Sequence, residues 1–185
     1  PIIIINLHSG IMKVAITGAH RVGETTLAEE LQKALTGYEF IQEPYYEMEE
    51  SGYMFSEIPT VDDYLAQLKY SIKQISGNKG NVIFDRCPLD FMAYIEAING
   101  QGYIQSLYGK VEDVMKEIDL LVFVHIESRD IVRCDESDLP ELRHQVNDIL
   151  SEWVWDFETE TIEVTGTQLA RKKQIIDTLA RIAAR

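Results

Sequence analysis

Short apolar runs alternate with amphipathic stretches along most of the chain. The runs of strand length cover residues 14–17, 39–42, 82–84, 120–126 and 161–164. Several are apolar throughout, which is typical of strands covered on both faces. The alternation predicts βαβ units, and therefore an α/β fold of three layers in which a parallel five-stranded sheet has helices on both faces.

The stretches between these runs carry helical periodicity and helix-end signals. In the first of them, Leu27, Leu31 and Leu35 share one helical face and Gly37 follows as a stop signal. Thr60 is a good N-cap residue for the next helix. The predicted helices cover residues 23–35, 61–76, 88–98, 111–118 and 168–183.

The segment between the first strand and the first helix carries the strongest functional signal. Gly18 follows the strand, Gly23 comes five residues later, and Thr25 opens the helix. This is the context of a phosphate-binding loop of the form G-x-x-x-x-G-K-[ST]. Glycines let backbone N–H groups surround a phosphate, and the helix N-terminus adds unpaired donors. The alternative is an ordinary glycine-containing turn. The residues predicted to bind ATP are Gly18, Ala19, His20, Arg21, Val22, Gly23, Glu24, Thr25 and Thr26, and the Thr25 hydroxyl is predicted to ligate Mg²⁺.

One position departs from that motif, because Glu24 stands where the lysine is expected. A carboxylate 4 Å from a phosphate oxygen costs about 4 kcal/mol at an effective dielectric constant of 20. The backbone cradle does not depend on this side chain. We therefore expect the loop to form. The Glu24 carboxylate then either turns outward, to solvent or to Arg21, Arg86 or a lid arginine, and leaves the cradle usable, or it folds across the loop, pairs with those arginines and occupies the phosphate site itself.

A second polar pair follows the third predicted strand, where Asp85 precedes Arg86. Ligands of open parallel sheets bind beyond the carboxyl ends of the strands. We therefore expect both side chains to lie in the same crevice as the loop, where a carboxylate can help to hold Mg²⁺ and a guanidinium can bind phosphate. The alternative is a surface ion pair.

Several segments together resemble P-loop nucleoside and nucleotide kinases. The loop, the Glu43-Pro44 pair, the segment from Asp85 to Tyr94 and the turn at residues 164–167 occur in the order typical of that group. The Asp85-Arg86 segment is similar to thymidylate kinases, and Glu43-Pro44 is similar to deoxynucleoside kinases. The chain from Met12 onward also resembles small AAA-domain, NadR-like proteins.

This resemblance implies a P-loop NTPase fold and roles for individual residues. Glu43 would be the base for the phosphate acceptor, Asp85 would orient metal or acceptor, and Arg86 would bind the transferring phosphate. Gln67 would read a base. A solvent-exposed acid in an acidic loop is the alternative for Glu43.

The resemblance also places an arginine-bearing lid after the fourth strand. Arg129, Arg133 and, further on, Arg143 would cover the phosphates there. The alternative is an ordinary charged helix. The 164–167 turn would line the adenine pocket.

Composition limits the kinds of partner that the chain can bind. The formal net charge of −14 disfavours nucleic-acid binding. The apolar run at residues 2–5 is too short to cross a membrane. Cys87 and Cys134 lack metal-ligand spacing and suit a reducing cytoplasm.

Residues 12–185 form one predicted domain, and residues 1–11 are either an extra edge strand or an extension before a start at Met12.

These observations favour an ATP-dependent kinase with a small-molecule acceptor: a nucleoside, a nucleotide or a similar compound. Because of Glu24, a nucleotide-binding regulatory domain with little catalysis is the second hypothesis, and a simple NTP hydrolase is the third. A ring-forming motor is disfavoured, because Arg86 rather than Glu follows Asp85. The sequence leaves a homodimer open.

Overall fold

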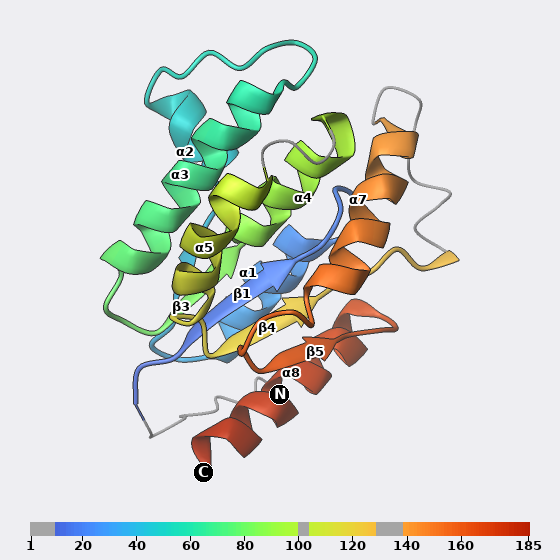
Figure 1. The fold of residues 1–185 in the computed structure, drawn as a ribbon. Helices are drawn as coiled ribbons and strands as arrows, with labels where there is room; N and C mark the ends of the chain where they lie inside the picture. Colours follow the sequence, from blue (N-terminus) through green and yellow to red (C-terminus); the bar gives the residue numbers. More distant parts are fainter. Residues whose placement is uncertain (1–9, 100–103, 129–138) are drawn as a thin grey trace.

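The computed structural model describes residues 10–99, 104–128 and 139–185 (Figure 1). Its strands are β1 (Lys13–Thr17), β2 (Glu39–Ile41), β3 (Val82–Asp85), β4 (Leu120–Phe123) and β5 (Thr161–Glu163). Its helices are α1 (Glu24–Ala34), α2 (Pro44–Glu50), α3 (Val61–Gly77), α4 (Pro88–Asn99), α5 (Ile104–Met115), α7 (Pro140–Trp153) and α8 (Gln168–Ala183).

The five described strands form one parallel sheet in the order β2-β3-β1-β4-β5. The predicted α/β fold is therefore confirmed. The central strands β1, β3 and β4 are buried at every position, as the apolar runs at residues 14–16, 82–84 and 120–123 indicate. Because all strands run the same way, the residues that follow β1, β2 and β3 meet at one edge of the sheet.

Side chains alternate between two cores on the two faces of the sheet. On one face, Val14 and Ile83 pack with Leu27 and Leu31 of α1 and with Ile175 of α8. On the other face, the core joins the sheet to α3, α4, α5 and α7, and its largest buried side chains include Phe84, Phe91 and Phe123. The helices thus form the two outer layers, which Figure 1 shows around the sheet.

Helix ends follow the predicted local signals in two places. The Thr60 hydroxyl accepts a hydrogen bond from the Asp63 amide at 3.3 Å, and the Asp63 carboxylate accepts one from the Thr60 amide at 3.0 Å. This capping box fixes the start of α3, the helix that forms one wall of the cavity described below. Helix α8 has the predicted bounds.

Two predicted boundaries were wrong. Strand β4 ends at Phe123 rather than at residue 126, and α5 begins at Ile104 rather than near residue 111. The helices α2 and α7 were not predicted. Helix α2 has only seven residues, too few to establish a periodicity, whereas α7 is amphipathic and buries Arg143, Val146 and Leu150.

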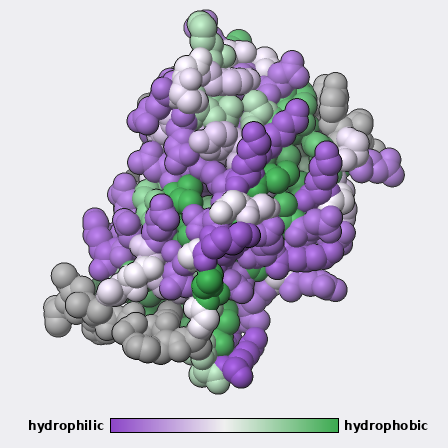
Figure 2. All heavy atoms as spheres, turned by 90° about the vertical axis from the view of Figure 1, so that its left-hand side faces the viewer, coloured by the Kyte–Doolittle hydropathy of each residue, from purple (hydrophilic) through white to green (hydrophobic). Residues whose placement is uncertain are grey.

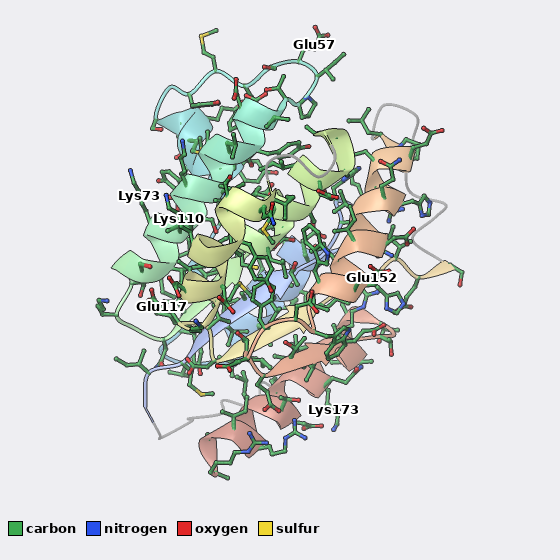
Figure 3. All side chains as sticks on the ribbon, viewed as in Figure 1. Glu57, Lys73, Lys110, Glu117, Glu152 and Lys173 are labelled. Atoms are coloured by element: carbon green, nitrogen blue, oxygen red, sulfur yellow. The ribbon has the colours of Figure 1, made fainter. Side chains whose placement is uncertain are left out.

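The surface agrees with the acidic composition. The face in Figure 2 is mainly hydrophilic, with smaller hydrophobic patches between the polar side chains. Figure 3 shows labelled charged side chains such as Glu57, Lys110 and Lys173 on the outside of the molecule. No helix within the described ranges combines the length and the apolar character that a membrane span requires.

Candidate nucleotide site

The loop between β1 and α1 needs glycine at both predicted positions. A Cβ atom on Gly18 would lie 2.6 Å from the carbonyl oxygen of Val124 and 2.9 Å from a methyl group of Val22. Gly23 has a φ of +88°, in the left-handed region that other residues rarely adopt. The backbone therefore turns tightly into α1, whose first-turn amides have no partner within the helix.

Side chains of α4 hold the amide groups at the start of this loop. Asp90 accepts hydrogen bonds from the amides of Gly18 at 3.0 Å and of Cys87 at 2.8 Å. The hydroxyl of Tyr94 accepts one from the His20 amide at 3.0 Å and lies 2.8 Å from His20 Nδ1. Helix α4 thereby links the loop to the segment that follows β3.

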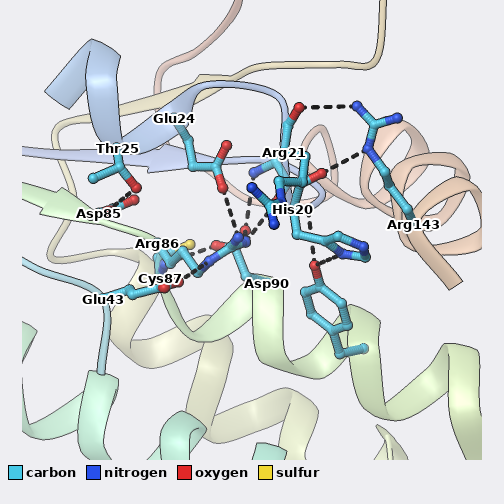
Figure 4. A network of polar contacts seen from close by, with 12 residues as sticks. His20, Arg21, Glu24, Thr25, Glu43, Asp85, Arg86, Cys87, Asp90 and Arg143 are labelled. Atoms are coloured by element: carbon cyan, nitrogen blue, oxygen red, sulfur yellow. Dashed lines mark hydrogen bonds and ion pairs between the residues drawn. The ribbon is translucent and has the colours of Figure 1, made fainter. Parts of the chain in front are cut away.

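Arg143 of α7 holds two carbonyl groups of the loop. It is fully buried, and it donates to the carbonyl oxygens of His20 at 2.8 Å and of Arg21 at 3.1 Å (Figure 4). The sequence interpretation of Arg143, as a lid arginine or as an ordinary surface charge, was therefore wrong, because its guanidinium supports the loop backbone.

Helix α8 holds the next two carbonyl groups. Arg171 donates to the Val22 oxygen at 2.8 Å, and Gln168 donates to the Gly23 oxygen at 3.0 Å. The carbonyl groups of residues 20–23 are thus all bound to side chains of α7 and α8, which fixes the loop backbone. Sequence reasoning missed Gln168, Arg171, Asp90 and Tyr94. The only available signal was the spacing of Asp90, which stands four residues after Arg86.

Arg86 is the centre of the polar network in Figure 4. Its Nε donates to Glu43 at 2.5 Å and one terminal nitrogen donates to Glu24 at 2.8 Å. The other terminal nitrogen donates to the Gly18 carbonyl oxygen at 2.7 Å and lies 3.5 Å from Asp90. Arg86 is 6% exposed and has a φ of +73°. A surface ion pair is therefore excluded.

The Glu24 side chain is buried and pairs with Arg86, one of the partners expected for it, so it does not point to solvent. Burial is the largest influence on this carboxyl group and raises its pKa, against the lowering influence of Arg86. Within the described part of the chain, Glu24 Oε2 has no hydrogen-bond partner. The acid at the lysine position thus binds the arginine expected to bind phosphate.

Thr25 and Asp85 form the part of the site that suits a metal ion. The Thr25 hydroxyl donates to Asp85 Oδ2 at 2.7 Å, while the buried Asp85 Oδ1 has no hydrogen-bond partner among the described residues. Burial raises the pKa of Asp85 to about 7. Hydroxyl and carboxylate oxygens are suitable Mg²⁺ ligands, and Mg²⁺ usually takes its other ligands from water and phosphates. These two residues therefore fit the ion.

A cavity of about 340 Å³ opens beside the loop. Its size is in the range of small-molecule sites. Glu43, Arg86 and His20 line the end next to the phosphate loop, whereas Tyr64 and Gln67 belong to the wall formed by α3. The cavity therefore joins the residues expected to act on phosphate to a pocket with aromatic and amide groups.

The remaining predicted residues lie elsewhere. Arg129 and Arg133 fall outside the described residues. The turn at 164–167 is bound to the segment that follows β4, because Glu127 accepts a hydrogen bond from the Gly166 amide at 2.7 Å. Of the predicted side chains, the structure brings together Glu24, Thr25, Glu43, Asp85 and Arg86.

Comparison with known proteins agrees with this architecture. The AAA domain family model matches residues 13–172. A search of curated proteins finds no match.

Solved structures show the same fold at low sequence identity. A deoxyadenosine kinase from M. mycoides is 19% identical with a TM-score of 0.65, and the match covers 92% of this chain and 100% of that chain. A thymidylate kinase from Candida albicans is 17% identical with a TM-score of 0.63, over 94% of this chain and 92% of that one. NadR in complex with NR is 18% identical with a TM-score of 0.72; the match covers 97% of this chain but only 51% of that chain. This chain thus spans about half the length of NadR. The chain belongs to the AAA domain family and is a P-loop protein with the fold of nucleoside and nucleotide kinases.

Proposed function

We propose that this protein is a cytoplasmic phosphotransferase that moves the γ-phosphoryl group of ATP to a nucleoside, a nucleotide or a similar small acceptor. The observation that carries the proposal is the cavity beside the loop, with Glu43 and Arg86 at the junction of the two. Donor and acceptor sites that share a boundary are what a direct phosphoryl transfer requires. Residues 12–185 form the proposed domain.

On the donor side, residues 18–26 would hold the phosphates of ATP. The first-turn amides of α1 supply donors and the positive end of the helix dipole. Thr25 and Asp85 would hold Mg²⁺, which neutralises charge on the phosphate oxygens when bound.

On the acceptor side, Glu43 would accept the proton of the attacking hydroxyl group. A bond forms between that oxygen and the γ-phosphorus, the bond from the γ-phosphorus to the β,γ-bridging oxygen breaks, and ADP leaves. Arg86 reaches the same place and would stabilise the negative charge of the group in transit. Gln67, whose side chain is only 6% exposed, would orient the acceptor through its amide.

A phosphorylation assay over a panel of nucleosides and nucleoside monophosphates, with ATP and Mg²⁺, tests this proposal. Product should form with at least one acceptor and should fall by a factor of 10² or more in the Glu43→Gln variant, since general bases contribute about 10²–10⁴-fold. Glu50→Gln is the matched control, because Glu50 is exposed at the end of α2, the helix that begins directly after Glu43. ADP formed without any phosphorylated acceptor would instead indicate a hydrolase.

The Glu24–Arg86 ion pair favours a second candidate function, which is nucleotide binding without transfer. In that case the arginine stays bound to Glu24, and ATP acts as a regulatory ligand. Calorimetry with ATP, in the presence and absence of Mg²⁺, separates the two. Binding that is unaffected by Mg²⁺, together with no transfer to any acceptor, supports the regulatory domain.

A further inference from the structure

His20 of the phosphate loop is held by the protein at its amide, at its carbonyl group and at its ring. The amide N–H donates to the Tyr94 hydroxyl oxygen at 3.0 Å, and the carbonyl oxygen accepts from Arg143 Nε at 2.8 Å. The ring nitrogen Nδ1 lies 2.8 Å from the same Tyr94 hydroxyl group (Figure 4). The backbone and the imidazole ring of this residue therefore both have a fixed orientation.

The Tyr94 side chain that holds the ring is itself fixed. It is 5% exposed, its ring stacks on the ring of Tyr64 with the centroids 4.8 Å apart, and the Arg86 guanidinium carbon lies 5.9 Å from its ring centroid. Burial raises the pKa of the Tyr94 hydroxyl well above its usual value, so the group keeps its proton. A hydroxyl group has one such proton to donate.

The hydrogen-bond balance at this hydroxyl assigns the tautomer of His20. An amide N–H can only donate, so the Tyr94 oxygen is the acceptor in its contact with the His20 backbone. The hydroxyl proton is then donated to the ring nitrogen at 2.8 Å, and Nδ1 is its acceptor. A ring nitrogen that accepts carries no proton, so the neutral imidazole carries its proton on Nε2. His20 is thus a neutral donor through Nε2–H.

His20 lies at the boundary between the loop and the cavity. Of residues 18–26, all of which the structure describes, it is the one that lines the cavity, where Glu43 and Arg86 also lie. In the proposed reaction the terminal phosphate of ATP lies at this boundary, because it leaves the nucleotide on the loop for an acceptor in the cavity. A neutral donor suits a place next to Arg86, since it binds phosphate oxygens without adding a second positive charge beside the guanidinium.

We infer that His20 binds the γ-phosphate of ATP through Nε2–H, and that Tyr94 is the positioning residue that fixes the tautomer and the orientation of the His20 ring. The inference rests on the donor half of the proposed function, in which residues 18–26 hold the phosphates of ATP. It concerns the terminal phosphate alone. The His20 side chain should therefore contribute to the binding of ATP and not to the binding of ADP.

Two replacements of His20 separate this role from a structural one. Asparagine keeps an acceptor for Tyr94 near the position of Nδ1 but has no donor near Nε2, whereas glutamine places an amide N–H near Nε2 and gives up the acceptor at Nδ1. In calorimetry with Mg²⁺, His20→Asn should weaken ATP binding by about tenfold or more, as expected for a lost hydrogen bond to a charged group. ADP binding should be nearly unchanged, and His20→Gln should bind ATP more tightly than His20→Asn.

The control for these variants is His144→Asn, because His144 is exposed on α7, and it should bind both nucleotides like the parent protein. A role of His20 in loop structure alone predicts the reverse order, with His20→Asn the better binder. That order, equal losses of ATP and ADP affinity, or an unchanged ATP affinity in His20→Asn would overturn the inference.

Nitrogen-15 NMR of the histidine rings tests the role of Tyr94 without any nucleotide. At about pH 8, where a histidine ring is ordinarily neutral, the His20 signals should show a proton on Nε2 and none on Nδ1. They are identified by their loss in His20→Asn. In Tyr94→Phe the Nδ1 signal should shift and the form protonated at Nδ1 should become detectable, whereas Tyr108→Phe, at a 36% exposed position on α5, should leave the signals unchanged.

A proton on Nδ1 in the parent protein, or an unchanged Nδ1 signal in Tyr94→Phe, would overturn the assignment. The binding results are also distinct from those that test the proposed function. A selective loss of ATP affinity in His20→Asn, in a protein that forms no phosphorylated product with any acceptor, would contradict the proposed function and leave this inference standing. Product formation with an ATP affinity that does not depend on His20 would overturn the inference alone.

Discussion

Arg143 Nε lies 2.8 Å from the carbonyl oxygen of His20, although 123 positions separate the two residues in the chain. The contact joins α7 to the phosphate loop and buries a guanidinium completely. A buried carbonyl group that loses its donor costs about 1–3 kcal/mol. Arg143 is therefore a positioning residue, whose effect on a nucleotide passes through the loop backbone.

Replacing Arg143 by methionine should destabilise the protein. It removes the donors of the His20 and Arg21 carbonyls, so we expect the free energy of unfolding to fall by about 2–4 kcal/mol in urea titrations. ATP binding should weaken as well, because the loop loses its support. Arg181→Met is the control. The Arg181 side chain is 59% exposed and its ion pair with Glu160 lies at the surface, so a loss below about 1 kcal/mol is expected. Equal losses in both variants would contradict the assigned role.

The role of Arg143 also shows where sequence reasoning stops. Strands β1, β3 and β4 could be located because a strand covered on both faces must be apolar throughout, and the loop could be located because its two glycines have a backbone reason to be there. A buried arginine on α7 has the same sequence signature as an exposed one, since its burial depends on which helix the chain places beside the loop. Likewise, the spacing of residues 18–25 predicts a cradle but not which side chains hold its carbonyls.

Gly18→Ala should damage the site through sterics alone. The added methyl group would lie 2.6 Å from the Val124 carbonyl oxygen, so strand β1 or the segment after β4 must move. Overpacking of this kind costs about 1–3 kcal/mol in thermal or urea unfolding. Gly109→Ala should have the opposite sign, with a gain of about 0.5–1 kcal/mol, because Gly109 lies within α5 with open space around its Cα atom. A Gly18→Ala variant as stable as the parent protein would show that the loop is not packed as closely against Val124 as described here.

Stability should depend on pH through Asp85. Its pKa is raised from 3.8 to about 7, so between these values the folded protein holds a proton that the unfolded chain has lost. The bound proton therefore stabilises the folded protein fully below pH 3.8, and this stabilisation is lost as the pH rises toward 7. Between pH 5 and pH 7.5 the parent should lose up to about 2.5 kcal/mol more than the Asp85→Asn variant.

The control for this titration is Asp113→Asn. The Asp113 side chain is 79% exposed, so this variant should follow the parent protein at both pH values. An Asp85→Asn variant with the same pH profile as the parent would mean that this carboxyl group is ionised in the folded protein throughout the range.

Glu24→Lys tests the position at which this chain departs from the phosphate-loop motif. The Glu24 carboxylate is buried and binds the Arg86 guanidinium at 2.8 Å. The variant frees Arg86 from one of its acids and replaces a charge that repels phosphate by one that attracts it. We expect calorimetry to show Mg²⁺–ATP binding at least tenfold tighter, or about 1.4 kcal/mol, well below the Coulomb energy of a charge pair at 4 Å. Any transfer rate should rise, because lysine stabilises charge on the β and γ oxygens.

Two further variants separate the local effect from net charge. Glu24→Gln removes the negative charge and keeps an acceptor for Arg86, so its gain should be intermediate. Glu29→Lys makes the same change in net charge at an exposed position on α1 and should leave affinity nearly unchanged, since a solvent-exposed charge is screened by salt. Equal affinities in the parent protein and Glu24→Lys would show that this side chain does not act on the phosphates. Glu24 would then serve only to hold Arg86, and the weakened-site hypothesis would be wrong.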